Sequence, residues 1–402
     1  MWVRFFVVHF FDREAGSQNM KKEHKKRMHY LDHAATTAVL PEAAAIACRV
    51  MTEQFGNPSS VHRMGIEASG ILETARKQVA AILSAAPSEV TFTSCGTEAT
   101  ATAIYGACRR KGRGKHIITT AIEHSATLNT VRQLEQEGFE VTYLQPDADG
   151  HIAVSDLRDA IRPDTVLLTC MLANNEVGTI LPVKEFGKIL KKKAPQALFH
   201  IDAVQGLARI PIKPKLWNAD FISVSGHKIG APKGIGALYI RKGVRIAPLM
   251  VGGGQERGMR PGTEATPNIA AFGEACRIRQ EQLEDNYAKV EALCAQLEAG
   301  IAQRFPWAVY NGKHDMPHVV NVSFPGCKSE VLLRVLEMHE VYVSSGSACA
   351  KGKASHVLAA MQLGHERIDS ALRISFAPSN TPEDVEVLLD ALEEGTKRLR
   401  RE

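Results

Sequence analysis

Short apolar segments alternate with helical ones over residues 66–245, and this alternation is the strongest constraint on the fold. Seven segments of four or five residues have the apolar character of buried strands, and helical segments lie between most of them. Apolar strands separated by helices favour a mostly parallel sheet that is covered on both faces. We therefore predict a large α/β domain built on such a sheet. The strand segments are 90–93, 116–119, 141–144, 165–169, 198–201, 221–224 and 237–240.

The later part of the chain predicts a smaller α+β domain. A long helical region at about 269–305 leads away from the sheet. Strand-like segments then follow at 319–324, 341–343 and 372–376, and an amphipathic helix occupies 382–400. We assign residues 41–268 to the large domain. Residues 29–40 and 269–402 are assigned to the small one.

Composition and charge exclude several classes of protein. The 402 residues are 45% hydrophobic and 23% charged, which is typical of a soluble globular chain. No apolar run approaches the ~20 residues that a membrane helix requires, so we expect no membrane association. Of the net charge of +5, residues 1–28 carry +4, from seven Lys/Arg against three Asp/Glu, and the rest of the chain carries +1. Such a charge gives no reason to expect nucleic-acid binding.

The eight cysteines are dispersed along the chain. None forms a Cys-x-x-Cys pair, and none has the Cys/His spacing of a metal site. Scattered cysteines in a chain of this length indicate free thiols in a reducing compartment. We therefore expect a cytoplasmic protein without a metal centre.

Residues 1–28 differ from the rest of the chain. Their apolar run is interrupted by Arg4 and His9, and it has neither a basic leader nor a clear cleavage site, so a secretory signal is not expected. Two interpretations stay open. The segment is a disordered extension, or the true start of the protein is Met20 or Met28.

A lysine and an aspartate stand at the ends of two predicted strands. Lys228 lies in Ser225-Gly-His-Lys228 after segment 221–224, and Asp202 directly follows segment 198–201. In an open parallel sheet, ligands bind at the carboxyl ends of the strands. A lysine there forms a Schiff base with an aldehyde, and a carboxylate keeps a pyridine nitrogen protonated. The pair predicts pyridoxal 5'-phosphate (PLP) as cofactor, and the Ser-x-His-Lys context favours Lys228 over nearby Lys233.

Other strand ends supply groups suited to the rest of this cofactor. Free N–H groups at a helix start, together with nearby polar side chains, attract a phosphate. His124 follows segment 116–119 and is placed to stack on the pyridine ring, while Asn175 could hydrogen-bond the ring hydroxyl. The predicted phosphate-binding residues are Gly96, Thr97, Ser225 and His227.

Eight motifs occur in an order that is typical of one family. They are Tyr30-Leu-Asp-His-Ala-Ala-Thr-Thr37, Phe55-Gly-Asn-Pro-Ser-Ser-Val-His62, Cys95-Gly-Thr-Glu98, Asn174-Asn-Glu176, Asp202-Ala-Val-Gln205, Ser225-Gly-His-Lys228, Arg260-Pro-Gly-Thr263 and Ser344-Ser-Gly-Ser-Ala-Cys349. The chain resembles the NifS/IscS-like cysteine desulfurases, which belong to class V of the fold-type-I PLP aminotransferases. The resemblance extends from about Tyr30 to Leu392.

The resemblance implies further roles. Gln205 and Asn175 would contact the phenolic oxygen of the cofactor, and Asn175 and Arg373 would bind the substrate. A guanidinium group suits this task because it can hold a carboxylate through two parallel hydrogen bonds. Thr263 would reach the phosphate of the other subunit, which implies a homodimer. His124 would be catalytic together with Lys228.

Cys349 distinguishes this activity from other reactions of a PLP lysine site. It lies in a Gly- and Ser-rich segment beside Lys351 and Lys353, and nearby cations favour the nucleophilic thiolate. The resemblance implies that Cys349 takes the sulfur of L-cysteine as a persulfide, releases L-alanine and passes the sulfur on. The interval from Cys349 to His356 is short for this family, so the sequence leaves the reach of the thiol open.

We therefore predict a PLP-dependent cysteine desulfurase that serves iron–sulfur cluster assembly, thio-cofactor synthesis or tRNA thiolation. Its sulfur acceptor would be an iron–sulfur scaffold, a tRNA-thiolation enzyme or a thiamine enzyme. A selenocysteine lyase or another PLP-dependent aminotransferase is the alternative. A non-catalytic sulfur-carrier scaffold is disfavoured, because it would need none of Lys228, Asp202 and Cys349.

Overall fold

The structure is a computed structural model that describes residues 27–109, 114–345 and 354–400. Nearly all of the predicted extension, residues 1–28, lies outside these ranges, as does Cys349. In the described part, none of the helices combines the length and the hydropathy needed to cross a bilayer.

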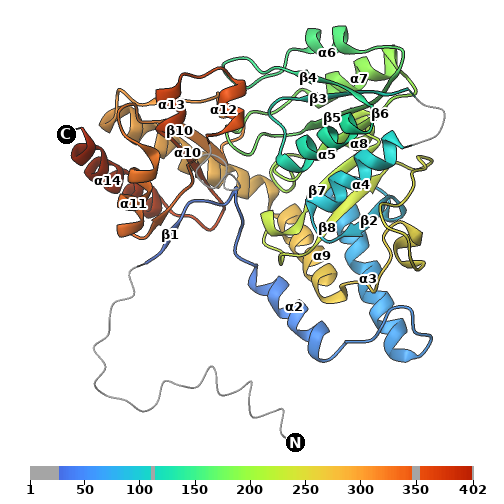
Figure 1. The fold of residues 1–402 in the computed structure, drawn as a ribbon. Helices are drawn as coiled ribbons and strands as arrows, with labels where there is room; N and C mark the ends of the chain where they lie inside the picture. The colour runs from blue at the N-terminus through green and yellow to red at the C-terminus, as the bar shows by residue number, and fades with distance from the viewer. Residues whose placement is uncertain (1–26, 110–113, 346–353, 401–402) are drawn as a thin grey trace, which may run out of the picture.

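A seven-stranded sheet forms the centre of the larger domain (Figure 1). Its strand order is β2-β8-β7-β6-β5-β3-β4. Strand β8 runs antiparallel to both of its neighbours, and the other adjacent pairs are parallel. The mostly parallel sheet predicted from the apolar segments is therefore confirmed. The strands are β2 (Val90–Thr93), β3 (His116–Thr120), β4 (Glu140–Leu144), β5 (Thr165–Met171), β6 (Leu198–Asp202), β7 (Phe221–Ser225) and β8 (Gly236–Ile240).

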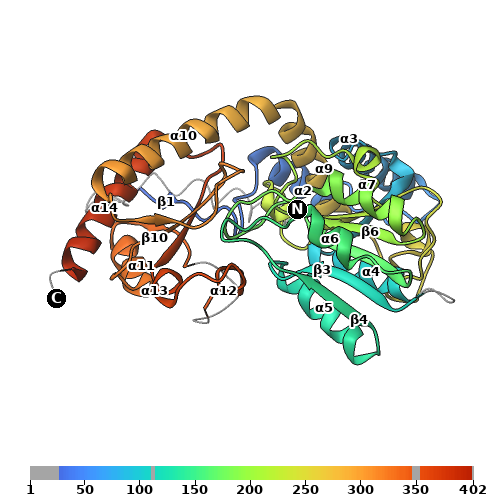
Figure 2. The ribbon, with the colours of Figure 1, turned by 90° about the horizontal axis from the view of Figure 1, so that it is seen from above.

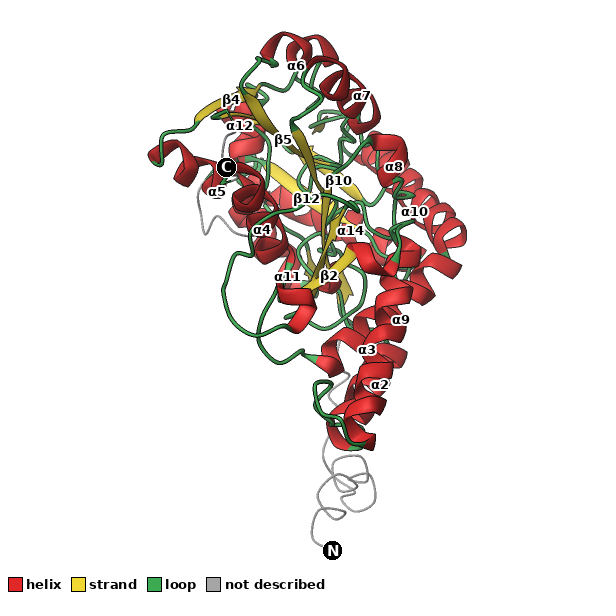
Figure 3. Ribbon diagram, turned by 90° about the vertical axis from the view of Figure 1, so that its right-hand side faces the viewer, coloured by secondary structure: helices red, strands yellow, loops and turns green. Residues whose placement is uncertain are grey.

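Helices cover both faces of this sheet (Figure 3). The neighbours Ile117 and Ile118 are both fully buried but belong to different apolar clusters. This is possible because successive side chains of a strand point to opposite faces. The helices around this sheet are α2 (Pro41–Thr52), α3 (Arg63–Ile82), α4 (Gly96–Cys108), α5 (Ser125–Gln136), α6 (Val154–Ala160), α7 (Val183–Lys193), α8 (Pro214–Trp217) and α9 (Thr266–Glu281). Residues 269–281, which were assigned to the small domain from the sequence, pack with the large one, because Ile269, Ala271 and Phe272 of α9 belong to its apolar cluster. Short 3₁₀ turns are η1 (Pro87–Glu89), η2 (Gly226–Lys228) and η3 (Gln255–Gly258).

The smaller lobe has its own sheet and core. A three-stranded antiparallel sheet, ordered β12-β10-β9, packs with helices of this lobe, and a two-stranded parallel sheet joins β1 to β11. Its apolar cluster includes Leu31, so the segment after β1 belongs to this core. The elements are β1 (His29–Tyr30), α10 (Leu283–Arg304), β9 (Val309–Tyr310), β10 (Val319–Ser323), α11 (Ser329–Met338), β11 (Val341–Tyr342), α12 (His356–Ala360), α13 (His365–Asp369), β12 (Ala371–Ser375) and α14 (Pro382–Leu399).

The prediction of a single long helical region at 269–305 is wrong in one respect. The chain forms two helices, α9 and α10, which are separated at Gln282. Gln282 has φ −106° and ψ 13°, so its backbone leaves the helical geometry and the direction of the chain changes. Figure 2 shows α10 running from the larger lobe over the smaller one.

A buried ion pair ties α3 to the edge of the large sheet. Arg76 donates from Nη1 and Nη2 to the two carboxylate oxygens of Glu256, both at 2.8 Å. Glu256 also accepts from the backbone N–H of Phe92 at 2.8 Å, and Arg76 donates to the carbonyl of Val90 at 3.0 Å. Both charged side chains are almost completely buried. Removing one partner would therefore leave the other charge unpaired in the interior.

We expect Arg76→Met to lower the free energy of unfolding by about 3–5 kcal/mol, because the carboxylate of Glu256 would stay buried without its guanidinium. Thermal unfolding measured by calorimetry tests this. Arg63→Met is the matched control on the same helix, since it removes only an exposed pair with Glu67, and we expect a much smaller loss because water screens such a pair. Equal losses for the two variants would contradict the assignment.

Candidate active site

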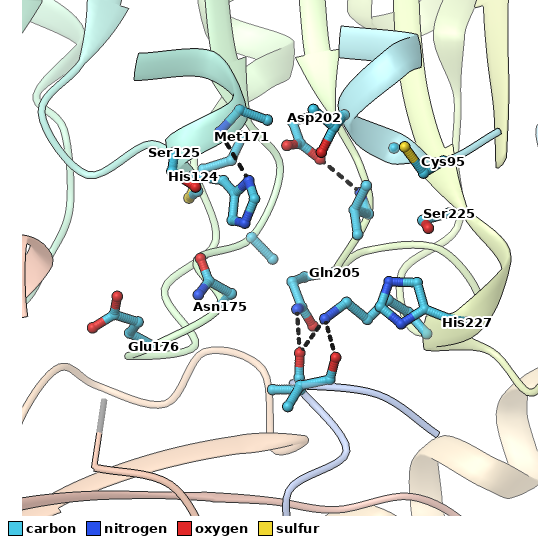
Figure 4. Close-up of a pocket in the computed structure, with 18 of the residues that line it drawn as sticks. Cys95, His124, Ser125, Met171, Asn175, Glu176, Asp202, Gln205, Ser225 and His227 are labelled. Atoms are coloured by element: carbon cyan, nitrogen blue, oxygen red, sulfur yellow. Dashed lines mark hydrogen bonds between the residues drawn. The ribbon is translucent and has the colours of Figure 1, made fainter. Parts of the chain in front are cut away.

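A cavity of about 670 Å³ opens at the carboxyl ends of the parallel strands. Its walls come from residues that follow β3, β5, β6 and β7, and from the small domain. Figure 4 shows the labelled polar side chains arranged around a common opening. The residues that line the cavity include Ala34, Ala35, Gly96, Thr97, His124, Asn175, Glu176, Asp202, Gln205, Ser225, His227, Lys228, His356 and Arg373. Most of the predicted site residues therefore meet in one cavity.

Lys228 ends the short turn η2 that follows β7. Its Nζ donates to the carbonyl oxygens of Ala34 at 2.5 Å and Ala35 at 2.8 Å. The amine thus lies at the cavity, against the segment that crosses from the small domain. The rival Lys233 is exposed and does not line the cavity.

Asp202 is the last residue of β6 and is buried in the cavity wall. Its Oδ1 accepts from the backbone N–H of Val204 at 3.0 Å. Burial raises the pKa of Asp202, while His124 and Lys228 act in the opposite direction. A ligand nitrogen that carries a proton would be stabilised beside this carboxyl group.

His124 occupies the N-cap of α5, and its ring faces the cavity (Figure 4). Its Nδ1 accepts from the backbone N–H of Ala126 at 3.1 Å. This bond fixes the ring orientation and assigns the proton of the neutral imidazole to Nε2. Burial is the largest cause that lowers the pKa of His124, which favours the neutral ring.

One end of the cavity is suited to an anion. Gly96 begins α4, so backbone N–H groups there lack helical partners. The hydroxyl Oγ of Ser225 is buried beside it without a hydrogen-bond partner among the described residues. A Cβ at Gly96 would come within 2.8 Å of the Val204 side chain, so only glycine leaves this space free. These groups fit a phosphate.

His227 and Thr97 complete this end. His227 hydrogen-bonds Thr36 Oγ1 through Nδ1 at 3.2 Å. Burial lowers the pKa of His227 to about 4, with Lys228 and Lys233 contributing, so the ring is neutral. Thr97 lines the cavity from the first turn of α4.

Arg373 brings the small domain into the site. Its side chain is fully buried, donates to Asp32 Oδ1 at 2.7 Å and to the carbonyl of Asn175 at 3.2 Å, and leaves Nε without a partner in the described structure. A guanidinium at the cavity wall provides a positive charge for a carboxylate. The Asn175 side chain also faces the opening (Figure 4).

Gln205 is held by protein partners. It donates to the Ala34 carbonyl at 3.0 Å and accepts from Arg209 at 2.5 Å. Thr263 is exposed and lies away from this cavity, and Cys349 is outside the described residues. Their predicted roles stay predictions.

The sequence analysis missed an anchor between the small domain and the site. Ser355, the N-cap of α12, donates to Glu176 Oε2 at 2.5 Å, and His356 Nε2 contacts the carbonyl of Glu123 at 2.9 Å. On the other side of segment 346–353, Ser344 exchanges two backbone hydrogen bonds with Arg373, of 3.1 and 2.6 Å. The residues that flank the segment of Cys349 are therefore fixed beside the cavity.

Glu123 is a second group that the sequence analysis missed. Its carboxyl is fully buried, and Oε1 accepts from Thr120 Oγ1 at 2.6 Å and from the Met171 N–H at 2.9 Å. Burial, with a smaller contribution from Asp202, raises the pKa of Glu123 to about 8. Its place next to His124, in a buried strand-end motif, was the only signal in the sequence.

Comparisons with known proteins give a consistent result. The model of the family described as Aminotransferase class-V matches residues 29–388. A protein named cysteine desulfurase IscS from Clostridium botulinum is 43% identical over 378 residues, which cover 92% of this chain and 95% of the relative. A solved structure titled NifS-like protein superposes with a TM-score of 0.87 at 38% identity, covering 92% of this chain and 99% of that chain. Another, titled SspA in complex with cysteine, has a TM-score of 0.77 at 34% identity, covering 88% and 99%.

We expect Glu123→Gln to change how stability depends on pH. The pKa of Glu123 is raised in the folded protein, so the stability that its proton provides is complete below about pH 4.5 and is lost as the pH rises to about 8. Glutamine imitates the protonated carboxyl at every pH. The wild type should therefore lose stability relative to the variant by up to about 1.4 kcal/mol per pH unit over this window, with no further change above it.

Calorimetric Tm values of both proteins from about pH 5 to 9 check this expectation. Other titrating groups cancel in the difference between the two proteins. A difference that stays constant over this range would show that Glu123 does not carry the raised pKa.

Proposed function

The chain belongs to the class-V aminotransferase family and, within it, to the cysteine desulfurases, and on this premise we propose that it converts L-cysteine to L-alanine and transfers the sulfur to an acceptor. The observation that carries the proposal is the meeting of Lys228, Asp202 and Arg373 in one cavity. In this cavity an amine, a carboxyl group and a guanidinium come from two different domains. Such a set can bind an amino acid together with an aldehyde cofactor.

We propose pyridoxal phosphate as the cofactor. When bound, it supplies an electron sink for the charge that develops at the α-carbon of the amino acid. The start of α4 and the Ser225 hydroxyl would hold its phosphate, Asp202 its ring nitrogen, and His124 one ring face. Gln205 would lie at the phenolic oxygen, as would Asn175. The free Ser225 Oγ and the space beside Gly96 support this fit.

The side chains of this chain have separate tasks in the proposed reaction. Arg373 and Asn175 orient L-cysteine through its carboxylate. Lys228 Nζ takes the α-proton, and a proton returns to the carbon skeleton as L-alanine forms. Neutral His124 holds a proton on Nε2 facing the cavity. The anchor formed by Ser355 and Glu176 keeps the start of α12 next to these groups.

We propose that Cys349 receives the sulfur. Its thiolate attacks the sulfur of L-cysteine, so that an S–S bond forms while the C–S bond of the substrate breaks. Overall, L-cysteine and the Cys349 thiol give L-alanine and a Cys349 persulfide, with no external oxidant or reductant. An acceptor thiol then removes the outer sulfur. The acceptor is an iron–sulfur scaffold or an enzyme of tRNA thiolation or thiamine synthesis.

We also propose a cytoplasmic homodimer, in which Thr263 completes the phosphate site of the partner. Thr263 is exposed and does not line the cavity of its own subunit, which supports this arrangement. Large apolar side chains are exposed at Val251, which is near Thr263 in the sequence, and at Phe55 and Val61. Exposed apolar side chains that lie together are typical of protein interfaces.

Lys228→Ala should abolish turnover of L-cysteine and the yellow colour of covalently bound pyridoxal phosphate. Lys233→Ala is the matched control, because it removes an exposed lysine that does not line the cavity, and we expect activity and colour close to those of the wild type. Absorbance spectra and alanine release measure both effects. Loss of colour in Lys233→Ala alone would reverse the assignment.

Cys349→Ser should keep the yellow colour. Its rate of alanine and sulfide production from L-cysteine should fall by more than about 100-fold, because serine is no sulfur nucleophile. Cys48→Ser, which removes an exposed thiol on α2, should retain the wild-type rate. Full activity of Cys349→Ser would refute the persulfide step, and undiminished activity on selenocysteine would favour a lyase.

A further inference from the structure

A second, small cavity lies on the other side of Lys228, where the two domains meet. Its volume is about 20 Å³, and we call it the arginine cavity. The large domain contributes Arg209, which follows β6, and Arg279 of α9. The small domain contributes His318, which precedes β10, and the segment after β12.

Neither guanidinium group at this cavity forms an ion pair with a carboxylate in the described part of the chain. Arg209 is only 7% exposed, and its hydrogen bonds go to the backbone and side-chain oxygens of Gln205, at 3.0 and 2.5 Å, both through Nη1. Arg279 donates through Nε to the Ile229 carbonyl at 3.0 Å. Within residues 27–109, 114–345 and 354–400, neither guanidinium has a carboxylate oxygen within 4.0 Å. Several of their N–H groups are therefore available to a ligand.

A buried imidazole at the cavity adds a polar group without a hydrogen-bond partner. His318 lines the cavity and is 4% exposed, and its Nδ1 is unpaired in the described structure. A second buried imidazole, His33, does not line the cavity, and its ring hydrogen-bonds the backbone of Tyr30. Burial is the main cause that lowers the pKa of His33 to about 4 and the pKa of His318 well below its usual value. Arg209 and Arg279 lower both pKa values further, so both rings are neutral, and His318 can donate one N–H to a ligand in the cavity.

The electrostatic field of this cluster is positive. Burial, followed by Arg279 and Arg373, lowers the pKa of Arg209 to about 10. The carboxyl groups that act on the cluster are Glu42, which raises the pKa of Arg279, and Asp384, which raises that of His33. Asp384 is already bonded to His29 at 2.8 Å. Buried charges without partners are costly, so an anion in the arginine cavity would stabilise the fold.

The size of the arginine cavity limits the anion. A single water needs roughly 10–15 Å³ of such space, so about 20 Å³ suits a monatomic ion better than the larger phosphate, sulfate or an amino acid. We propose that the arginine cavity binds one halide ion, chloride in the cell, between Arg209, Arg279 and His318. The ion would neutralise the two guanidinium groups at the junction of the two domains. This inference does not depend on the proposed desulfurase activity.

Crystals of the wild-type protein grown in sodium bromide test the location directly. We expect an anomalous bromide peak in the arginine cavity, within contact distance of both guanidinium groups. A cavity that contains only water, with bromide bound elsewhere or nowhere, would overturn the proposal.

Calorimetry tests the energetic effect with the purified protein, with and without pyridoxal phosphate. Sodium chloride should raise Tm by roughly 1–3 °C over sodium gluconate at equal ionic strength, and the rise should saturate. Arg279→Gln should lose most of this chloride-specific rise, and Arg279→Lys should keep part of it. Arg277→Gln is the matched control on α9, because Arg277 pairs with Glu274 and Glu281 away from the cavity, and it should keep the full rise.

Equal chloride responses in Arg279→Gln and Arg277→Gln would mean a general salt effect and would refute the halide site. An absent chloride response in the wild type would also refute it. If a variant does not fold, the wild-type calorimetry and the bromide crystals still decide the question.

Discussion

The parallel pairing of β5, β6 and β7 is the constraint on which the whole site depends. Met171 pairs with Asp202, and Asp202 pairs with Ser223, so the three strands end at the same edge of the sheet. Two backbone hydrogen bonds continue this ladder. The N–H of Leu172 donates to the Asp202 carbonyl at 2.8 Å, and the N–H of Ala203 donates to the Ser223 carbonyl at 2.9 Å. These bonds fix where each strand ends relative to its neighbour. A slip of one residue would turn Asp202 away from the cavity, because side chains alternate between the faces of a strand.

The small domain provides residues of the site that the strand ends of the large sheet do not. Arg373 reaches the site from β12, and its ion pair with Asp32 joins that strand to the segment after β1. Asn321 of β10 donates to the carbonyl of Glu176, whose carboxylate accepts from Ser355. Polar side chains of Asn321, Glu176 and Ser355 are thus buried between the domains with partners from both sides. Contacts that satisfy buried polar groups fix the relative position of two domains more specifically than apolar packing does.

Local patterns carried most of the predictions, and contacts distant in sequence explain what they missed. The buried strands were predictable because short apolar runs between helices leave few alternatives, and Asp202 and Lys228 followed from their places after two of these strands. The break between α9 and α10 at Gln282 could not be predicted from a local signal, because no glycine or proline stands at this position. Ser355 and Glu176 are separated by 179 positions, and His356 and Glu123 by 233, so no local pattern reveals these pairs. No sequence pattern singles out Arg209 and Arg279, which the fold brings to one cavity.

The strand β1 has a consequence for the order in which the protein forms during synthesis. His29 and Tyr30 leave the ribosome long before Val341 and Tyr342, with which they pair, and Asp32 likewise pairs with the late residue Ser375. The large sheet needs no residue beyond β8 for its strand pairing. Domains generally fold as units while the chain emerges. The large domain can therefore form before β11, the pairing partner of β1, has been synthesised. Since His356 and Arg373 also arrive late, a nascent chain that ends before His356 has the sheet but no complete site.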